Sequence, residues 1–320
     1  MPITRAEAFA PASMGNVGIG FDVLGLAYEE PGDRVVAVLR DEPGAILTYI
    51  EGDNGRLSLE PDENCATIAA NALLKTLNAD HGVALTLYKG LPLASGLGSS
   101  AASSVAAVVA VNALLGKPLS QPALLPAAME GEASVSGYHA DNIAPCLLGG
   151  ILLIAAPTAD QIRSLPVPDK MHFALVTPDV AVPTAEARTV LPQQVPIKAM
   201  VRQTVGVAQI IDALYRDDIE AAAAAMESDQ VIEPARAHLM PLLAEVRTAA
   251  KANGAFGVAI SGAGPTLCAI CDSQTNAQSA AAAMHAVYAN AAIDSTSYTT
   301  KVSQTGAQVL DITTTTESPL

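Results

Sequence analysis

The stretch GLPLASGLGSSAASSVAAVVAVNALLG, residues 90–116, joins a loop of glycine, serine and proline directly to an apolar, alanine-rich run. Gly96 and Gly98 permit tight turns, and Ser99 and Ser100 stand where a helix would begin. The free N–H groups and the positive dipole end of such a helix form an anion site, for which phosphate is the usual ligand. The apolar run predicts a buried helix that anchors this loop. An ordinary connection between a strand and a helix, with serine caps, explains the same residues equally well.

Two common phosphate-binding motifs are absent from the sequence. It contains no G-x-x-x-x-G-K-[ST] string, so the loop is not a Walker A loop. Its glycines do not spell G-x-G-x-x-G, which excludes the usual dinucleotide fingerprint.

The composition predicts two domains with a close-packed core. The chain has 320 residues, of which 50% are hydrophobic and only 3% aromatic. The formal net charge of −15 repels a phosphate backbone, so nucleic-acid binding is not expected. The N-terminal residues contain no apolar signal segment, and the alanine- and serine-rich run after Gly98 fits a buried helix better than a membrane span.

The four cysteines favour a cytoplasmic protein with reduced thiols. Cys268 and Cys271 have C-x-x-C spacing, but GPTLCAIC alternates like a buried strand, and no second ligand pair completes a zinc site. We therefore expect all four cysteines, including Cys65 and Cys146, to be buried and unpaired.

Strands and helices mix along the chain without strict βαβ alternation, which predicts an α+β fold. The proline-rich stretch 156–170 is the best candidate for a domain boundary. Periodicity predicts strands over 4–12, 33–40, 45–52, 81–91, 149–155, 172–177 and 296–302, with a strand, glycine turn and strand over 254–271. It predicts helices over 64–78, 99–115, 121–137, 184–190, 198–226, 239–253 and 275–290.

Three ordered segments resemble the motifs of the GHMP kinase superfamily of small-molecule kinases. They are PASMGNVGIGFDVLGLA (11–27), PLASGLGSSAAS (92–103) and GVAISGAGPTLCAI (257–270), the last with Ala263 where serine is expected. The resemblance implies the two-domain GHMP kinase fold. Residues 1–165 would form a domain like domain 2 of ribosomal protein S5, and residues 166–311 a ferredoxin-like α/β sandwich. The polar composition of residues 312–320 predicts a disordered tail.

Three variable segments resemble the homoserine kinase branch of that superfamily. They are HADNIAPCLLGG (139–150), PTAEARTVLP (183–192) and IEPARAHLMP (232–241). The resemblance implies ATP-dependent, Mg²⁺-assisted phosphorylation of the L-homoserine side-chain hydroxyl by a homodimer. Two alternatives stay open: a GHMP kinase for another alcohol, such as an isoprenoid precursor, and a binding protein that has kept the fold and lost catalysis.

The resemblance places the nucleotide and the metal on the glycine-rich loop and its neighbours. The implied nucleotide contacts are Pro92, Leu93, Ala94, Ser95, Gly96, Leu97, Gly98, Ser99, Ser100, Ala101 and Ala102. Asn64 would lie near the adenine or ribose, although it equally suits a helix cap. Ser100 and Glu132 are the implied Mg²⁺ ligands, since Mg²⁺ prefers oxygen donors. Glu130 lies two residues away and would point in another direction on the same helix.

The implied substrate is a zwitterion with a hydroxyl group, and each part needs its own partner. Arg188 and Arg236 would hold the carboxylate, and Asp22 the ammonium or hydroxyl end. Asn16 and Asn142 would orient the hydroxyl, with His139 nearby. The alternatives are that Asp22 caps a helix beginning at VLGLA, that the arginines are ordinary surface residues, and that His139 is structural.

No strong catalytic base is evident in the sequence. The position of Asn142 resembles that of an aspartate in the related mevalonate kinases and galactokinases. An amide cannot accept the hydroxyl proton as that aspartate would. The resemblance therefore implies direct phosphoryl transfer, with the hydroxyl proton passing to phosphate or water. Asp141 ranks second as a base, because its side chain would point elsewhere on an extended backbone.

Overall fold

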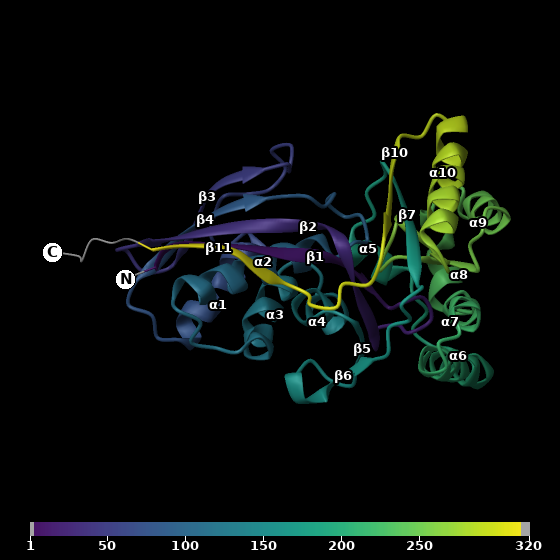
Figure 1. Cartoon of the computed structure of the whole chain (residues 1–320), viewed down its shortest axis with the longest axis horizontal. Coiled ribbons are helices and arrows are strands. Elements are labelled where there is room, and N and C mark those ends of the chain that lie inside the picture. The colour runs from purple at the N-terminus through teal and green to yellow at the C-terminus, as the bar shows by residue number, and fades with distance from the viewer. Residues whose placement is uncertain (1–2, 315–320) are drawn as a thin grey trace.

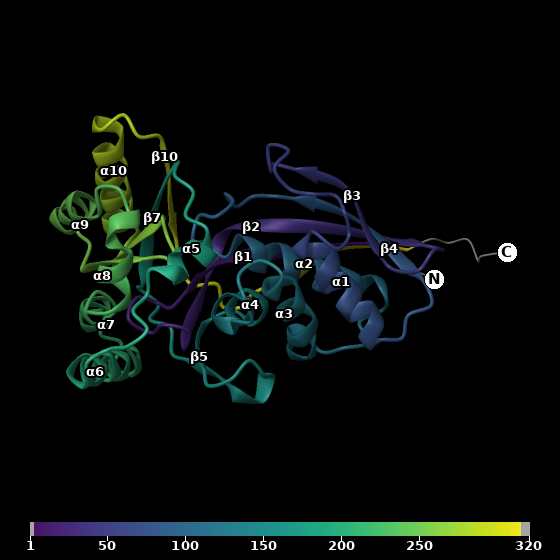
Figure 2. The same cartoon turned by 180° about the vertical axis from the view of Figure 1, so that it is seen from behind.

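The structure is a computed structural model, which describes residues 3–314. Two sheets lie side by side along the long axis, and helices cover one face of the first sheet (Figures 1 and 2). The first sheet has the order β11-β1-β2-β4-β3, with β5 added to β2 and β6 added to β5. Its strands are β1 (Ile3–Gly15), β2 (Leu24–Arg40), β3 (Ala45–Glu51), β4 (Gly82–Tyr88), β5 (Ile151–Ile154), β6 (Ile162–Leu165) and β11 (Gln308–Thr314). The helices on its covered face are α1 (Cys65–Thr76), α2 (Ser99–Leu114), α3 (Leu125–Ala133) and α4 (Ala140–Leu148).

Alanine makes the close contact between the first sheet and its helices possible. Ala6, Ala8 and Ala10 alternate along β1 with half-exposed residues, and all three are fully buried. Helix α2 packs against this face, and every one of its residues except Ser100 is buried. The expected buried helix behind the glycine-rich loop is therefore confirmed.

The second sheet has the order β10-β7-β9-β8 and is antiparallel throughout. In chain order this is 4-1-3-2, which confirms the ferredoxin-like arrangement of the C-terminal half. Its strands are β7 (His172–Pro178), β8 (Gly257–Ile260), β9 (Leu267–Cys271) and β10 (Ser295–Thr300). The helices of this half are α5 (Thr184–Thr189), α6 (Ile197–Tyr215), α7 (Ile219–Met226), α8 (Ile232–Arg236), α9 (Leu243–Ala252) and α10 (Gln274–Asn290). Single 3₁₀ turns lie at Gln121–Leu124, Ala159–Gln161 and Ala237–Leu239.

The end of the chain returns to the first sheet. Strand β11 pairs antiparallel with β1 over Ile3–Phe9, so residues 308–311 belong to the N-terminal half and not to a C-terminal domain ending at 311. Residues 312–314 of the expected disordered tail lie in this strand, and 315–320 are outside the described residues. The crossing from the first sheet to the second lies between Leu165 and His172.

The structure excludes one open alternative and corrects the bounds of two predicted helices. Asp22 caps no helix, because a strand begins at Leu24. The helix expected over 198–226 is broken after Tyr215, where Asp217 has φ +58° and Asp218 caps α7 by accepting from the Ala221 N–H. The helix expected over 121–137 ends at Ala133. Helix α4 was not predicted at all.

The cysteine prediction holds for three of the four residues. Cys146, Cys268 and Cys271 are buried and free, and the latter two lie in β9, as expected for a strand. Cys65 is also free, but it is partly exposed because it lines a cavity.

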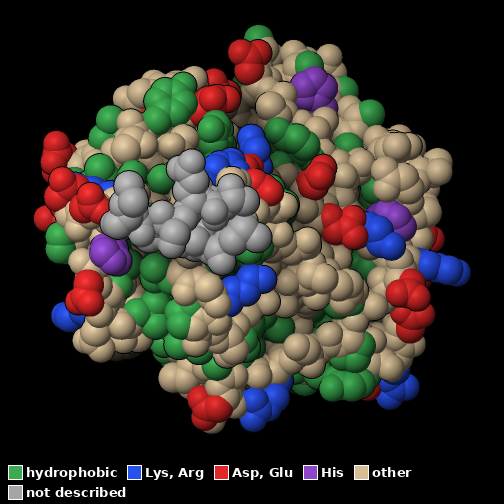
Figure 3. Space-filling view, turned by 60° about the vertical axis from the view of Figure 1, so that its left-hand side comes forward, with side chains coloured by type: hydrophobic (Ala, Val, Ile, Leu, Met, Phe, Trp, Pro, Cys, Tyr) green, Lys and Arg blue, Asp and Glu red, His purple; other side chains and the backbone are tan. Residues whose placement is uncertain are grey.

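No helix among residues 3–314 combines the length and apolar character needed to cross a bilayer. On the face shown in Figure 3, acidic and basic side chains are interspersed.

Candidate active site

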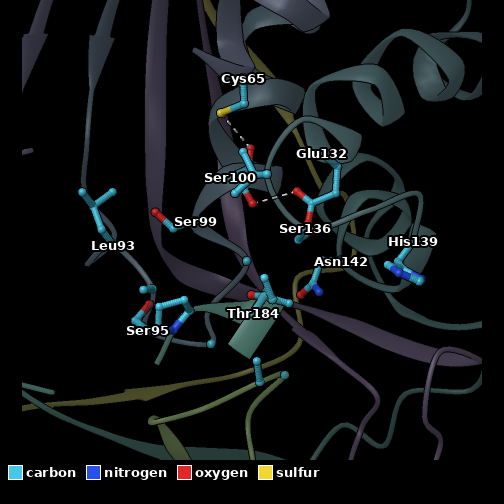
Figure 4. Close-up of a pocket in the computed structure, with 18 of the residues that line it drawn as sticks. Cys65, Leu93, Ser95, Ser99, Ser100, Glu132, Ser136, His139, Asn142 and Thr184 are labelled. Atoms are coloured by element: carbon cyan, nitrogen blue, oxygen red, sulfur yellow. Dashed lines mark hydrogen bonds between the residues drawn. The ribbon is translucent and has the colours of Figure 1, made fainter. Parts of the chain in front are cut away.

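A cavity of about 280 Å³ lies between the two halves of the molecule and collects most of the predicted site residues. Its walls come from the glycine-rich loop and the first turn of α2, from α3 and the start of α4, and from α5, α8 and the turn between β8 and β9. Figure 4 shows side chains from these elements converging on one space. A concave site of this size with a few polar groups is typical of a small-molecule site.

Contacts with two other segments fix the glycine-rich loop. The Ser13 N–H donates to the Leu97 carbonyl at 3.0 Å, and the Thr266 N–H donates to the Ser95 carbonyl at 3.1 Å. The Ser261 hydroxyl donates to the Gly96 carbonyl at 2.8 Å. The first and third sequence motifs thus hold the second motif in place.

Gly98 is required by both conformation and space. It is the N-cap of α2 with φ +66°, and no side chain caps the helix there. An added Cβ would lie 2.1 Å from Ser13 Oγ. The N–H groups of the first turn are therefore left without a side-chain cap, and they face the cavity that Ser99 and Ser100 line.

The predicted loop residues divide into two groups. Those that line the cavity are Leu93, Ala94, Ser95, Gly96, Gly98, Ser99 and Ser100. Pro92, Leu97, Ala101 and Ala102 do not line it. Leu97, Ala101 and Ala102 are fully buried in the core, so they support the loop from behind.

Glu132 faces the first turn of α2 from α3. Its Oε2 accepts from the Ser100 hydroxyl at 2.7 Å, and its Oε1 accepts from the Ser136 hydroxyl (Figure 4). Glu132 is 4% exposed, and burial raises the pKa of its carboxyl. Glu130 is exposed, which confirms that the two glutamates point in different directions.

The start of α4 brings His139, Asp141 and Asn142 to the cavity. Asn142 Oδ1 accepts from the Ser13 hydroxyl and from the Gly15 N–H, both at 3.0 Å, which orients the amide. The expectation that Asp141 points elsewhere was wrong, because the backbone here begins a helix and is not extended. Both side chains reach the end of β1, where a Cβ on Gly15 would lie 2.3 Å from Asp141 Oδ2.

Asp141 is a buried carboxyl facing the cavity. Asp141 is 3% exposed. Among residues 3–314, no other residue donates a hydrogen bond to its carboxyl group. Burial, reinforced by the charges of Asp22 and Glu132, raises the pKa of Asp141 to about 7. Such a carboxyl group suits a cationic ligand, because a bound cation would offset the free-energy cost of burying its charged form.

Asp22 and Arg188 bind each other. Arg188 donates to the two carboxylate oxygens of Asp22 at 2.7 and 3.2 Å. Its guanidinium also lies 5.2 Å from the centre of the Phe21 ring. Arg188 lines the cavity, whereas Asp22 stands behind it. The position of Asp22 therefore suits holding Arg188 better than contacting a substrate.

Arg236 and Asn16 tie the cavity floor together. Arg236 is 3% exposed and donates to the carbonyls of Ala187 and Gly262 at 3.0 and 3.1 Å. Asn16 donates to the Gly262 carbonyl at 3.0 Å and accepts from the Asp22 N–H at 3.1 Å. Both residues line the cavity, and neither is an ordinary surface residue.

His139 lines the cavity, and Asn64 does not. The Nδ1 of His139 lies 3.7 Å from Asp22 Oδ2, and burial with the nearby Arg188 charge lowers the pKa of His139. The side chain of Asn64 caps α1 by accepting from the Ala66 N–H, so the helix-cap interpretation is confirmed.

Sequence reasoning missed a buried ion pair beneath the loop. Lys89 forms a salt bridge with Asp33 and donates to the Ser99 carbonyl, Ser99 Oγ and Ser103 Oγ at 3.1, 2.8 and 2.9 Å. Asp33 also accepts from the N–H groups of Gly90 and Leu91. Lys89 lines the cavity, so one ammonium both contacts the site and fixes the start of α2. The only signal in the sequence was a lysine directly before the glycine-rich loop.

Ser100 and Glu132 suit a hard cation. Their oxygens are 2.7 Å apart at the start of α2, and burial raises the pKa of the Glu132 carboxyl. Among residues 3–314, no cluster of three or more His, Cys, Asp or Glu side chains forms a complete metal cage. Two protein oxygens plus phosphate and water are the usual environment of Mg²⁺ in such sites.

Comparisons with known proteins define the class of the fold and then the family. Residues 64–150 match the family described as "GHMP kinases N terminal domain", and residues 210–290 match "GHMP kinases C terminal". The fold is thus that of the GHMP kinases. A homoserine kinase from Chloroherpeton thalassium is 38% identical over 318 residues, covering 96% of this chain and 99% of that protein. The chain belongs to the homoserine kinase family.

Further relatives agree with this assignment. A homoserine kinase from Arabidopsis thaliana is 41% identical over 85% of this chain and 75% of its own length. The crystal structure of homoserine kinase from Cytophaga hutchinsonii is 41% identical and superposes with a TM-score of 0.91, covering 96% of this chain and 97% of that one. A galactokinase from Lactococcus lactis, 15% identical with a TM-score of 0.72, shares the fold alone.

Proposed function

We propose that this chain transfers the terminal phosphoryl group of ATP to the side-chain hydroxyl of L-homoserine, giving O-phospho-L-homoserine in the biosynthesis of threonine. One observation carries the proposal. The cavity presents a guanidinium (Arg188), a buried carboxyl without a partner (Asp141) and an oriented amide (Asn142) beside the uncapped start of α2. These groups complement the carboxylate, ammonium and hydroxyl of homoserine, next to a place for a triphosphate.

The nucleotide would bind through backbone and not through many side chains. Gly98, Ser99 and Ser100 line the cavity at the start of α2, where the backbone N–H groups have no side-chain cap, and Lys89 adds one buried positive charge below them. Leu93 and Cys65 line the same cavity and suit the apolar base. Ser100 and Glu132 would hold Mg²⁺, which neutralises phosphate charge when bound.

Asp141 and Arg188 would fix the two charged ends of the substrate. Asp22 already binds Arg188, so the ammonium is better matched by Asp141, whose carboxyl has no such partner. The substrate carboxylate would bind Arg188 on the side facing the cavity, with Arg236 adding positive charge behind it. His139 and Asn16 complete the wall at this end.

Phosphoryl transfer in this site relies on position. Asn142 Oδ1 already accepts two hydrogen bonds, which leaves its NH₂ group as the part available to hold the hydroxyl oxygen. The hydroxyl proton then passes to phosphate or water, because an amide cannot take it. Holding the reactants in line and neutralising charge are the main requirements of this reaction class. The free cysteines suit the reducing cytoplasm, where we place the enzyme, and we propose that it acts as a homodimer.

A substrate panel tests the proposal. ADP release would be measured with Mg·ATP and L-homoserine, L-serine, L-threonine, mevalonate or galactose, with ³¹P spectra identifying the product. We expect rapid turnover with L-homoserine only. Turnover of mevalonate without turnover of homoserine would assign the chain to another alcohol. Nucleotide binding with no ADP formation from any acceptor would instead favour a binding protein.

A further inference from the structure

Helix α6 is apolar on two opposite faces, and only one of them is covered. Gly206, Ile210, Ala213 and Leu214 face inward and are buried. The helix packs against α7, and Gly206 lies against Ile19, where an added Cβ would come within 2.4 Å of Ile19 Cδ1. An amphipathic surface helix normally carries polar residues on its other face.

The outer face of α6 instead gathers exposed apolar side chains. Six of the seventeen large apolar side chains that are exposed in residues 3–314 lie between positions 195 and 215: Val195, Ile197, Met200, Val201, Val205 and Tyr215. Ile197 and Tyr215 are 70% and 67% exposed. A large exposed apolar patch of this kind usually marks an interaction site.

The spacing along this face is that of a helix-pairing seam. Ile197, Val201, Thr204, Ala208, Ile211 and Tyr215 follow one another at intervals of four, three, four, three and four residues. Thr204 and Ala208 are exposed like the ends of the seam, and Ile211 is half-buried. A 4-3 repeat is the pattern with which two helices interlock along their length. The helix has 19 residues, so the seam is about 28 Å long.

We propose that this seam, residues 197, 201, 204, 208, 211 and 215, is the interface with a second copy of this chain, and that the two α6 helices pair antiparallel. The seam positions are symmetric about position 206, so a two-fold axis there places residue 197 against 215, 201 against 211 and 204 against 208 of the partner. A two-fold dimer uses the same patch on both copies, and a palindromic seam satisfies that condition. This interface rests on the homodimer proposed above.

The charges beside the seam also favour the antiparallel pairing. Lys198 and Arg202 flank its first half, and Asp212 flanks its second half on the same side of the helix. In the antiparallel pair, Asp212 of the partner subunit lies level with the gap between Lys198 and Arg202. A parallel pair would instead place like charges side by side and align the two helix dipoles.

The described ends of the chain cannot cover this face. Ile3 and Thr314 pair with each other at the far end of the first sheet, and α6 lies at the opposite end of the molecule (Figures 1 and 2). A second copy of the chain is the occupant that the symmetry and the charges fit.

The test measures the mass of the full chain in solution and disrupts the seam at one exposed position. We expect light scattering to give twice 32.6 kDa for the unmodified chain at micromolar concentration. Val201→Glu buries a charge at the seam and should weaken the dimer by at least about 100-fold, giving a monomer. Val201 is 53% exposed, so the substitution should leave the fold intact, as thermal unfolding would check. Val38→Glu, at a 41% exposed valine on β2, is the matched control and should remain dimeric.

Cysteine cross-linking tests the direction of pairing without weakening the seam. Thr204→Cys and Ala208→Cys chains, mixed and oxidised, should form a disulfide-linked dimer in much higher yield than either variant alone. The unmodified chain gives the background from Cys65, the one partly exposed native thiol. Self-linking of each single variant would contradict the antiparallel arrangement.

The outcomes separate the interface from the function. A monomeric unmodified chain overturns both the homodimer and the seam. A dimer that survives Val201→Glu, or one that Val38→Glu dissociates, overturns the seam and leaves the homodimer standing. Neither result bears on phosphoryl transfer to homoserine, which the substrate panel decides separately.

Discussion

Glu132 and Glu130 provide a matched pair of carboxylates two residues apart. Glu132 is buried against Ser100, while Glu130 points to solvent. We expect Glu132→Ala to lower kcat at least about 100-fold, because it removes one of the two proposed Mg²⁺ ligands. Glu130→Ala should stay within about twofold of the unmodified enzyme. Steady-state kinetics over a range of Mg²⁺ concentrations check this, and equal losses in both variants would contradict the assigned role of Glu132.

Asp141 couples substrate binding to pH and to stability. Its pKa is raised from the ordinary 3.8 to about 7 by burial. In the unfolded chain the carboxyl loses its proton near pH 4, while in the fold it keeps it until about pH 7, so the free enzyme loses stability as pH rises through this window. Asp141→Asn should therefore raise the melting temperature at pH 8, by the equivalent of at most about 4 kcal/mol, and leave it unchanged near pH 4.

The same substitution separates binding from proton transfer. An ammonium ligand at Asp141 predicts that Asp141→Asn raises KM for homoserine at least about tenfold, with a smaller effect on kcat. A collapse of kcat with unchanged KM would instead make Asp141 the catalytic base. Calorimetric binding of homoserine, with and without a non-hydrolysable ATP analogue, provides an independent measurement.

Lys89 and Asp33 hold the start of α2 from below. Their side chains are 1% and 0% exposed, so removing one partner leaves a buried charge. We expect Lys89→Met to cost about 3–5 kcal/mol of unfolding free energy and to raise KM for ATP. Lys89→Met combined with Asp33→Asn should recover much of the stability but not the affinity for ATP, because the positive charge is still missing. Recovery of both would show that Lys89 acts only through the fold.

Individual residues differ in how far the sequence alone could place them. The spacing of Glu130 and Glu132 indicated that they point in different directions, but only the resemblance to the family singled out Glu132. Asn64 had two equally good interpretations, and only the structure shows that its side chain caps α1. Lys89 and Asp33 are 56 positions apart in the sequence, and nothing local indicates that they form a buried pair. Asp141 was misjudged because its local backbone was taken as extended.

The glycine-rich loop and α2 act as one element, since the loop is clamped by the first and third motifs. Gly98→Ala should abolish nucleotide binding, because the new Cβ would lie 2.1 Å from Ser13 Oγ and 3.1 Å from Asn142 Oδ1. Gly116→Ala, at the far end of the same helix, is the matched control. Gly116 also has positive φ, at +80°, but has open space around it, so its substitution should cost only about 1–2 kcal/mol.

Fluorescence titration with a labelled nucleotide and thermal unfolding of both glycine variants check this prediction. Comparable loss of nucleotide affinity in the two variants would mean that backbone strain, and not the tight contact with Ser13, explains the effect.

Elements with strong periodicity were predictable, and elements set by distant contacts were not. Helix α2 follows directly from its apolar run, and strand β1 follows from the alternation of its residues. Helix α4 carries Pro145 within it and begins without a side-chain cap, so local signals argued against it. The break after Tyr215 depends on Asp217 adopting positive φ, a conformation that few residues other than glycine favour.

The chain passes from the first sheet to the second and then returns, because β11 pairs with β1 at the edge of the first sheet. A chain ending at Ala307 should be destabilised by several kcal/mol and prone to aggregate, since the removal bares the edge of β1. A chain ending at Thr314 is the matched control and keeps every β1–β11 pair. Denaturant unfolding and light scattering compare the two, and equal stability would show that β11 contributes little.

This return of the chain also escaped sequence analysis. The polar, threonine-rich residues 312–314 suggested disorder, but a strand at the edge of a sheet with one solvent-facing side needs few apolar residues. Pairing partners about 300 positions apart leave no local trace, so the domain boundary at 311 could not be corrected without coordinates.

The antiparallel pairing of Ile3 with Thr314 determines when the first sheet can be completed during synthesis. The first strand leaves the ribosome hundreds of residues before its outer neighbour, and at about 5–20 residues per second it waits many seconds with that side uncovered. The nascent polypeptide therefore cannot complete its larger sheet until residues 308–314 have been made. A stop before residue 308 releases a product whose first strand is still unpaired on that side.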